Sequence, residues 1–157
     1  DGLMRIASYV GRVPLPRDWA EAANIARDVN KRSFPDIDER GWEEIARQLF
    51  NEKRGKPAPG YDPMLKNALS VLDGPVPELW PQFDAQTRVP VLVVRGENSD
   101  ILSEETVALI AERHAALEQF TVPNQGHAPF LKDRATQEAI AMFIQRIDSV
   151  EEALAAE

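Results

Sequence analysis

Two residues of the chain, Asp100 and His127, have the chemistry of an acid–base pair, and each follows a predicted strand. Asp100 lies four residues after Gly96, which ends the apolar run Val89–Arg95, and His127 lies five residues after Val122. A carboxylate that accepts a hydrogen bond from an imidazole fixes the tautomer of the ring and stabilises the imidazolium formed on proton uptake. The pair could therefore act as a general base and the acid that orients it.

The elements that must position this pair are predicted to alternate between strand and helix. Val89–Arg95 is continuously apolar rather than alternating, which is typical of a parallel strand buried on both faces. Ser103 can cap a helix that leads to the weaker strand Phe120–Val122, and a last helix runs to about Ile147 before a fraying end. If the two strands are neighbours, their carboxyl ends lie about 5 Å apart. Binding and catalytic sites of parallel sheets form beyond these carboxyl ends. The order predicts an α/β unit with a right-handed crossover.

The residues before this unit predict helices and loops, with no strand before residue 89. Apolar residues recur at helical spacing over 1–11 and 16–31, and again from a cap at Asp36 or Asp38 to about Phe50. Residues 51–63 are rich in Gly and Pro and predict a long loop. Short helical pieces are expected over Met64–Leu72 and Pro77–Phe83. The chain is thus predicted to divide into an all-helical part, residues 1–82, and an α/β part, residues 83–157.

Composition and charge exclude several classes of function. The net charge of −8 over 157 residues disfavours binding to nucleic acid. The absence of cysteine excludes disulfides, zinc thiolate sites and thiol nucleophiles, and it agrees with a cytoplasmic location. No apolar run approaches the ~20 residues of a membrane span, and no signal pattern opens the chain. Because the chain begins at Asp1 within a predicted helix, we expect a processed chain or a fragment of a longer one.

Other residues near the pair have simpler interpretations. Glu97 is a rival for the role of the acid, because it lies in the same loop as Asp100. His114 continues the apolar face of its helix, which favours packing, and no spacing of acidic residues with histidine builds a metal site. Ser99 and Ser103 lack the glycine-flanked strand–turn–helix context of a nucleophile, so turn and capping roles are favoured.

Aromatic residues could line a pocket for an apolar substrate. Trp42, Tyr61 and Phe130 are the candidates for substrate contact, with Phe50 and Trp80 as further possibilities. Packing in the core is the competing interpretation for each of them.

The stretches PVLVVRGENSDILS and VPNQGHAPFL resemble the C-terminal portion of α/β-hydrolases of the esterase and carbon–carbon hydrolase kind. In that family the penultimate strand is followed by the triad acid and the last strand by a Gly-His loop with the triad base. The resemblance implies that Asp100 is the acid and His127 the base, and that no metal or organic cofactor takes part. It also implies that residues 1–82 form the helical cap or lid that this family inserts before the penultimate strand.

The sequence departs from the family because it contains no G-x-S-x-G elbow and no H-G-G-type oxyanion loop. The resemblance therefore implies a serine hydrolase, acting on an ester or related bond of a small molecule, whose nucleophile comes from a missing N-terminal half. Family members with an aspartate nucleophile leave that residue type open. The alternative is a non-catalytic binding or assembly module. In either case the two visible strands expose an apolar edge, which the other half or an exchanged copy of the chain should cover.

Overall fold

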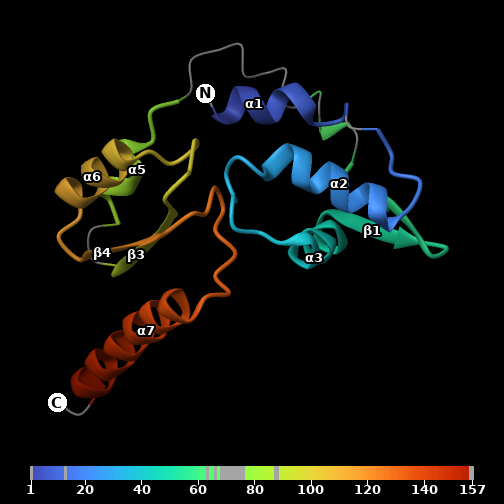
Figure 1. Ribbon diagram of the computed structural model, residues 1–157. Coiled ribbons are helices and arrows are strands. Elements are labelled where there is room, and N and C mark those ends of the chain that lie inside the picture. Colours follow the sequence, from blue (N-terminus) through green and yellow to red (C-terminus); the bar gives the residue numbers. More distant parts are fainter. Residues whose placement is uncertain are drawn as a thin grey trace. The chain divides into compact units, whose positions relative to one another are not determined.

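A computed structural model describes residues 2–12, 14–62, 64–65, 67, 77–86 and 89–155 of the chain. The chain divides into two compact units, unit 1 (Asp1–Pro77) and unit 2 (Glu78–Glu157), which are drawn in Figure 1. The sequence placed this boundary between residues 82 and 83. Residues 78–86 join unit 2 because Trp80 lies beneath the guanidinium of Arg113 at 4.7 Å and Phe83 lies 5.7 Å from the ring of His114.

The part of unit 1 that the structure describes includes the helices α1 (Gly2–Tyr9), α2 (Trp19–Asn30) and α3 (Glu39–Leu49). Capping aspartates precede α2 and α3. Asp18 accepts a hydrogen bond from the backbone N–H of Glu21, and Asp38 accepts one from Gly41, so each carboxylate pairs a helix N–H that has no partner within the helix. The predicted cap at Asp38 is thereby confirmed.

The core of unit 1 lies between α2 and α3. The alanines of α2 leave room for a tryptophan and an isoleucine of α3, and the buried residues of the two helices are Ala22, Ala23, Ala26, Trp42, Ile45 and Ala46. Trp42 is only 5% exposed, which gives it a packing role in this unit.

A β-hairpin replaces the long loop predicted over residues 51–63, so the expectation of no strand before residue 89 is wrong. β1 (Phe50–Lys53) pairs antiparallel with β2 (Lys56–Pro59). Arg54 and Gly55 form the two-residue turn with φ of 54° and 75°, the left-handed conformation that suits a tight hairpin. The sequence did not predict β2 because Pro57 and Pro59 are poor strand formers. Prolines are tolerated here because β2 pairs with β1 along one edge among the described residues. The helical piece predicted over 64–72 lies largely outside the described residues.

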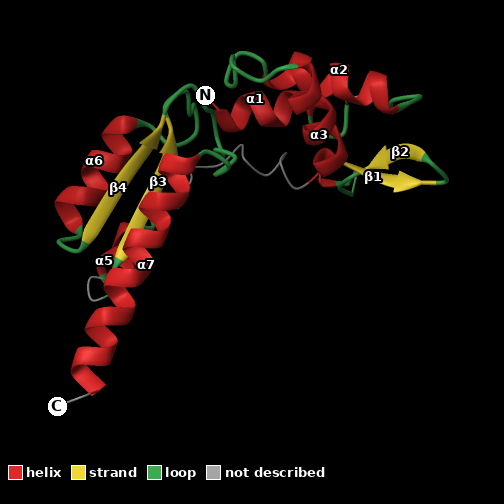
Figure 2. Ribbon diagram, turned by 60° about the horizontal axis from the view of Figure 1, so that its bottom comes forward, coloured by secondary structure: helices red, strands yellow, loops and turns green. Residues whose placement is uncertain are grey.

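Unit 2 is built on two parallel strands, as the sequence predicted. β3 (Val91–Gly96) pairs with β4 (Leu117–Val122) in register from Val91 opposite Leu117 to Gly96 opposite Val122. Figure 2 shows the strands side by side, with α6 (Glu104–Arg113) along β4 and α7 (Arg134–Ala155) along β3. The strand β4 begins earlier than predicted, and helix α7 continues through Ala155, beyond the end predicted near Ile147.

The prediction that the first strand is buried on both faces is wrong for the chain as described. Val91, Leu92, Val93 and Val94 are each partly exposed, and Val89 just before them is 54% exposed. The reason is that β3 and β4 pair only with each other among the described residues, so one edge of β3 stays open.

Polar and aromatic contacts fix the remaining elements of unit 2. Arg146 of α7 pairs with Glu118 of β4, which ties the long helix to the sheet. The ring of His114 is 1% exposed and its Nε2 lies 3.2 Å from the carbonyl oxygen of Gln86, so the predicted packing role is confirmed.

None of the helices in the described parts of the chain has the length and apolar character needed to cross a bilayer.

Asp133 caps α7, and its substitution should change how stability depends on pH. Its carboxylate accepts hydrogen bonds from the backbone N–H of Thr136 at 2.8 Å and the hydroxyl of Thr136 at 2.6 Å. These bonds hold the pKa of Asp133 below its usual value. The stabilisation is therefore present above the pKa of the unfolded residue, about 3.9, and is lost as the pH falls through the lower folded pKa.

We expect Asp133→Ala to lower the unfolding free energy at pH 7 by about 1 kcal/mol, measured by urea denaturation. Asp133→Asn keeps a capping group that does not titrate, so it should cost less at pH 7 and weaken the acid-induced loss of stability. Equal stabilities of wild type and both variants at pH 7 would contradict this role of Asp133.

Candidate functional site

The site begins with a close approach of two backbones at the carboxyl ends of β3 and β4. A Cβ atom built on Gly96 would lie 2.1 Å from the carbonyl oxygen of Gly126 and 2.4 Å from that of Gln125. Real Cβ atoms do not approach other atoms so closely, so only glycine fits at the end of β3. This contact brings the loop with Asp100 against the loop with His127.

Hydrogen bonds between the two loops hold this arrangement. The N–H of Glu97 donates to the carbonyl of Val122 at 2.9 Å, and the N–H of Asn98 donates to the carbonyl of Gln125 at 2.8 Å. In the opposite direction, the N–H of Asn124 donates to Oε2 of Glu97 at 2.8 Å. The loops after the two strands are thus one connected structure, which the sequence predicted only in the form of neighbouring strand ends.

Arg95 organises the acid-bearing loop from within. Its side chain is 7% exposed, its Nε donates to the carbonyl of Leu102 at 2.8 Å, and its Nη2 donates to that of Glu97 at 3.2 Å. Its Nη1 lies 3.4 Å from Oε1 of Glu104 at the start of α6. The bonds close the loop around Asp100 at both ends. This role was not predicted from the sequence, although a charged residue at the end of an apolar strand is a signal for it.

The loop that holds His127 is shaped by Gln125 and Asn124. The Oε1 atom of Gln125 accepts a hydrogen bond from the N–H of Phe130 at 2.7 Å, which folds the segment around His127. Asn124 has φ of 54°, a left-handed conformation that asparagine adopts more readily than most residues. Both Asn124 and Gln125 were absent from the sequence-based candidates.

The structure places the predicted acid and base on adjoining loops, with both side chains exposed. Glu97, the rival acid, has an oxygen engaged by the backbone of Asn124, which gives it a structural role at the junction of the loops. The serine candidates also have local roles. Ser99 Oγ accepts from the N–H of Leu102 at 3.0 Å, and Ser103 caps α6 by accepting from Thr106 at 3.1 Å.

The three aromatic candidates for substrate contact fall in different places. Phe130 is half-buried and follows His127 in the same loop. Tyr61 is 42% exposed in unit 1, where it lines a cavity with Phe50. Trp42 is buried in the core of unit 1 and is not among the residues that line this cavity. No cluster of three or more potential metal ligands occurs among the residues that the structure describes.

The chain is similar in sequence and structure to known hydrolases. The chain is 32% identical over 146 residues to the 3-hydroxybutyrate-oligomer hydrolase of Cupriavidus necator, covering 87% of this chain and 49% of that protein. An α/β hydrolase from Novosphingobium aromaticivorans is 36% identical, with a TM-score of 0.79, over 92% of this chain and 52% of that one. No protein-family model matches the chain.

A protein from Rickettsia typhi shares the fold alone. It is 20% identical, with a TM-score of 0.73, over 92% of this chain and 48% of that one. The chain therefore spans about half the length of each of the proteins compared here.

The role of Arg95 predicts a specific loss of stability. Arg95→Met keeps most of the aliphatic stem but leaves the carbonyls of Leu102 and Glu97 without their donor, so we expect a cost of about 1–3 kcal/mol in unfolding free energy. Arg134→Met is the matched control, because Arg134 is 90% exposed and pairs with Glu138 along its own helix, where a pair contributes about 0.3–0.5 kcal/mol. Urea denaturation of both variants measures the difference, and equal losses would contradict the organising role of Arg95.

Proposed function

Because the chain belongs to the α/β-hydrolase fold superfamily, we propose that it supplies the acid and the base of a hydrolase active site, Asp100 and His127. The observation that supports this most strongly is the junction of their two loops through Gly96, Asn98 and Gln125. Such a junction at the carboxyl ends of parallel strands is where a triad of this fold is assembled.

The proposed reaction is serine-type hydrolysis of an ester. Asp100 holds the imidazole of His127, whose free ring nitrogen takes the proton of a serine hydroxyl as the oxygen attacks the ester carbonyl. The imidazolium then gives this proton to the departing alkoxide, leaving an acyl-serine. A water molecule, deprotonated by His127 in the same way, releases the acid and restores the serine. Asp100 stays ionised throughout and stabilises the imidazolium.

The serine is proposed to lie in a segment outside these 157 residues. The sequence contains no G-x-S-x-G pattern, and Ser99 and Ser103 are engaged by the backbone. The chain also matches only about half of its relatives' length. We propose that the missing half packs on the open edge of β3, where Val89 is 54% exposed, and that unit 1 acts as the cap. A second copy of the chain on this edge, without catalysis, is the competing assignment.

The substrate class follows from chemistry and from one relative. An ester needs no metal in this mechanism, and the relative from Cupriavidus necator is named for hydrolysis of 3-hydroxybutyrate oligomers, which are joined by ester bonds. We propose short aliphatic esters as substrates, with Phe130, which follows His127 in the same loop, as the candidate for substrate contact.

The test joins this chain to the part of the Novosphingobium aromaticivorans hydrolase that it does not cover. We expect the folded chimera to hydrolyse p-nitrophenyl butyrate and the 3-hydroxybutyrate dimer, whereas the chain alone is no faster than buffer. Asp100→Asn should lower kcat by roughly 10³- to 10⁴-fold, and His127→Ala at least as much. Glu97→Gln is the matched control and should keep kcat within about threefold, because an amide oxygen can still accept from Asn124.

Two results would overturn the proposal. The first is a cooperatively folded chimera without esterase activity. The second is activity that survives His127→Ala, which would require a different base.

A further inference from the structure

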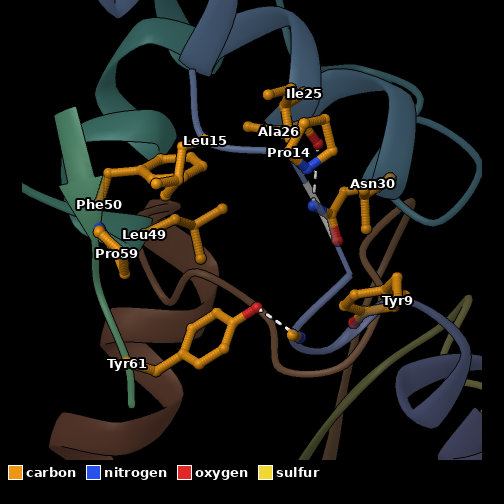
Figure 3. Close-up of a pocket in the computed structure, with 12 residues that line it drawn as sticks. Tyr9, Pro14, Leu15, Ile25, Ala26, Asn30, Leu49, Phe50, Pro59 and Tyr61 are labelled. Atoms are coloured by element: carbon orange, nitrogen blue, oxygen red, sulfur yellow. Dashed lines mark hydrogen bonds between the residues drawn. The ribbon is translucent and has the colours of Figure 1, made fainter. Parts of the chain in front are cut away.

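A second candidate site lies within unit 1 and is independent of the loops of Asp100 and His127. This unit 1 cavity has a volume of about 330 Å³. It is bounded by α2, the end of α3, the hairpin and the connection between α1 and α2 (Figure 3). All the residues that line it lie between Tyr9 and Tyr61, so the unit forms it without the catalytic loops.

The cavity has a buried floor and an exposed rim. Ala26 on the floor is 1% exposed, whereas Leu15, Leu49 and Tyr61 at the rim are 65%, 46% and 42% exposed. Figure 3 shows Leu15, Leu49 and Phe50 on the side opposite Asn30. A ligand entering from solvent would cover these apolar side chains, which favours binding by the hydrophobic effect.

The lining favours an uncharged ligand. None of the described residues that line the cavity is Asp, Glu, Lys, Arg or His. A charged group placed among them would lose hydration without gaining an ionic partner, which disfavours its binding.

Two polar groups give the cavity a recognition point. The hydroxyl oxygen of Tyr61 accepts a hydrogen bond from the N–H of Gly11 at 3.0 Å, which leaves its own hydrogen to donate. The Nδ2 atom of Asn30 donates to the carbonyl of Ala26 at 2.9 Å, and that bond leaves the amide oxygen to accept. A ligand with one hydroxyl or carbonyl group can pair with these groups while the rest of it stays apolar.

The volume sets the size of the ligand. About 330 Å³ is the space of roughly eleven water molecules at about 30 Å³ each, which suits a molecule of on the order of ten to twenty non-hydrogen atoms. We propose that unit 1 binds a small, uncharged, mostly apolar molecule with one hydroxyl or carbonyl group in this cavity.

The test uses two fluorescent probes with the same rings and different charge. N-phenyl-1-naphthylamine is neutral, and 8-anilino-1-naphthalenesulfonate adds a sulfonate. Titrated into the full chain, the neutral probe should bind at a single site at least tenfold more tightly than the charged one. Methyl octanoate should displace it at concentrations at least tenfold below those that octanoate requires.

Variants locate the binding. Leu15→Asp puts a carboxylate at the exposed rim and should weaken the neutral probe at least fivefold. Leu79→Asp is the matched control, since Leu79 is 60% exposed and lies outside the cavity, and it should change the affinity less than twofold. Tyr61→Phe removes the donor and should weaken methyl octanoate at least threefold, with less than twofold effect on the probe, which lacks a carbonyl. Circular dichroism confirms that each variant is folded.

Three results would each overturn the proposal: equal affinity for the two probes, equal effects of Leu15→Asp and Leu79→Asp, or displacement by octanoate as effective as by methyl octanoate. If Leu15→Asp fails to fold, the probe comparison and Tyr61→Phe still decide the outcome. Because esterase activity enters none of these measurements, their result is independent of the proposed function.

Discussion

The arrangement of unit 2 depends on the absence of a side chain at Gly96. The backbone of Gly126 occupies the space that a Cβ would need, at 2.1 Å from its ideal position. With this contact, the N–H of Glu97 reaches the carbonyl of Val122 at the end of β4, and the N–H of Asn98 reaches that of Gln125 in the loop after it. The two loops therefore share one hydrogen-bond network, and the exposed Asp100 and His127 are positioned by backbone contacts rather than by burial of their own side chains.

The same hydrogen-bond network gives different roles to acidic residues that the sequence alone does not distinguish. Glu97 and Asp100 are carboxylates in one loop, but an oxygen of Glu97 is engaged by the N–H of Asn124. Arg95 is held inside the loop by carbonyl groups, with Glu104 as its partner at the start of α6. Acidic side chains around the site thus have structural roles, and the proposed catalytic role falls to Asp100.

Sequence patterns predicted the parts of the fold that rest on local signals. The structure confirms the capped helices α3 and α6 and the parallel pairing of β3 with β4. These features were predictable because capping residues and an apolar β-branched run are signals that extend over only a few positions. The hairpin was not predicted because Pro57 and Pro59 are unfavourable in strands. The turn at Arg54 and Gly55 depends on the pairing of β1 with β2, which local sequence patterns do not reveal. The position of Arg95 at the end of an apolar strand marks it as unusual, but its partners were not predictable because two of them are backbone carbonyls.

NMR of the chain itself tests directly whether Asp100 holds the ring of His127 in one tautomer. At a pH where the ring is neutral, two-bond ¹H–¹⁵N correlations distinguish protonation at Nδ1 from protonation at Nε2. We predict that His127 carries its proton on Nδ1, facing Asp100, and that Asp100→Asn shifts the population toward Nε2 while Glu97→Gln leaves it unchanged. A tautomer population that is the same in wild type and Asp100→Asn would contradict the account.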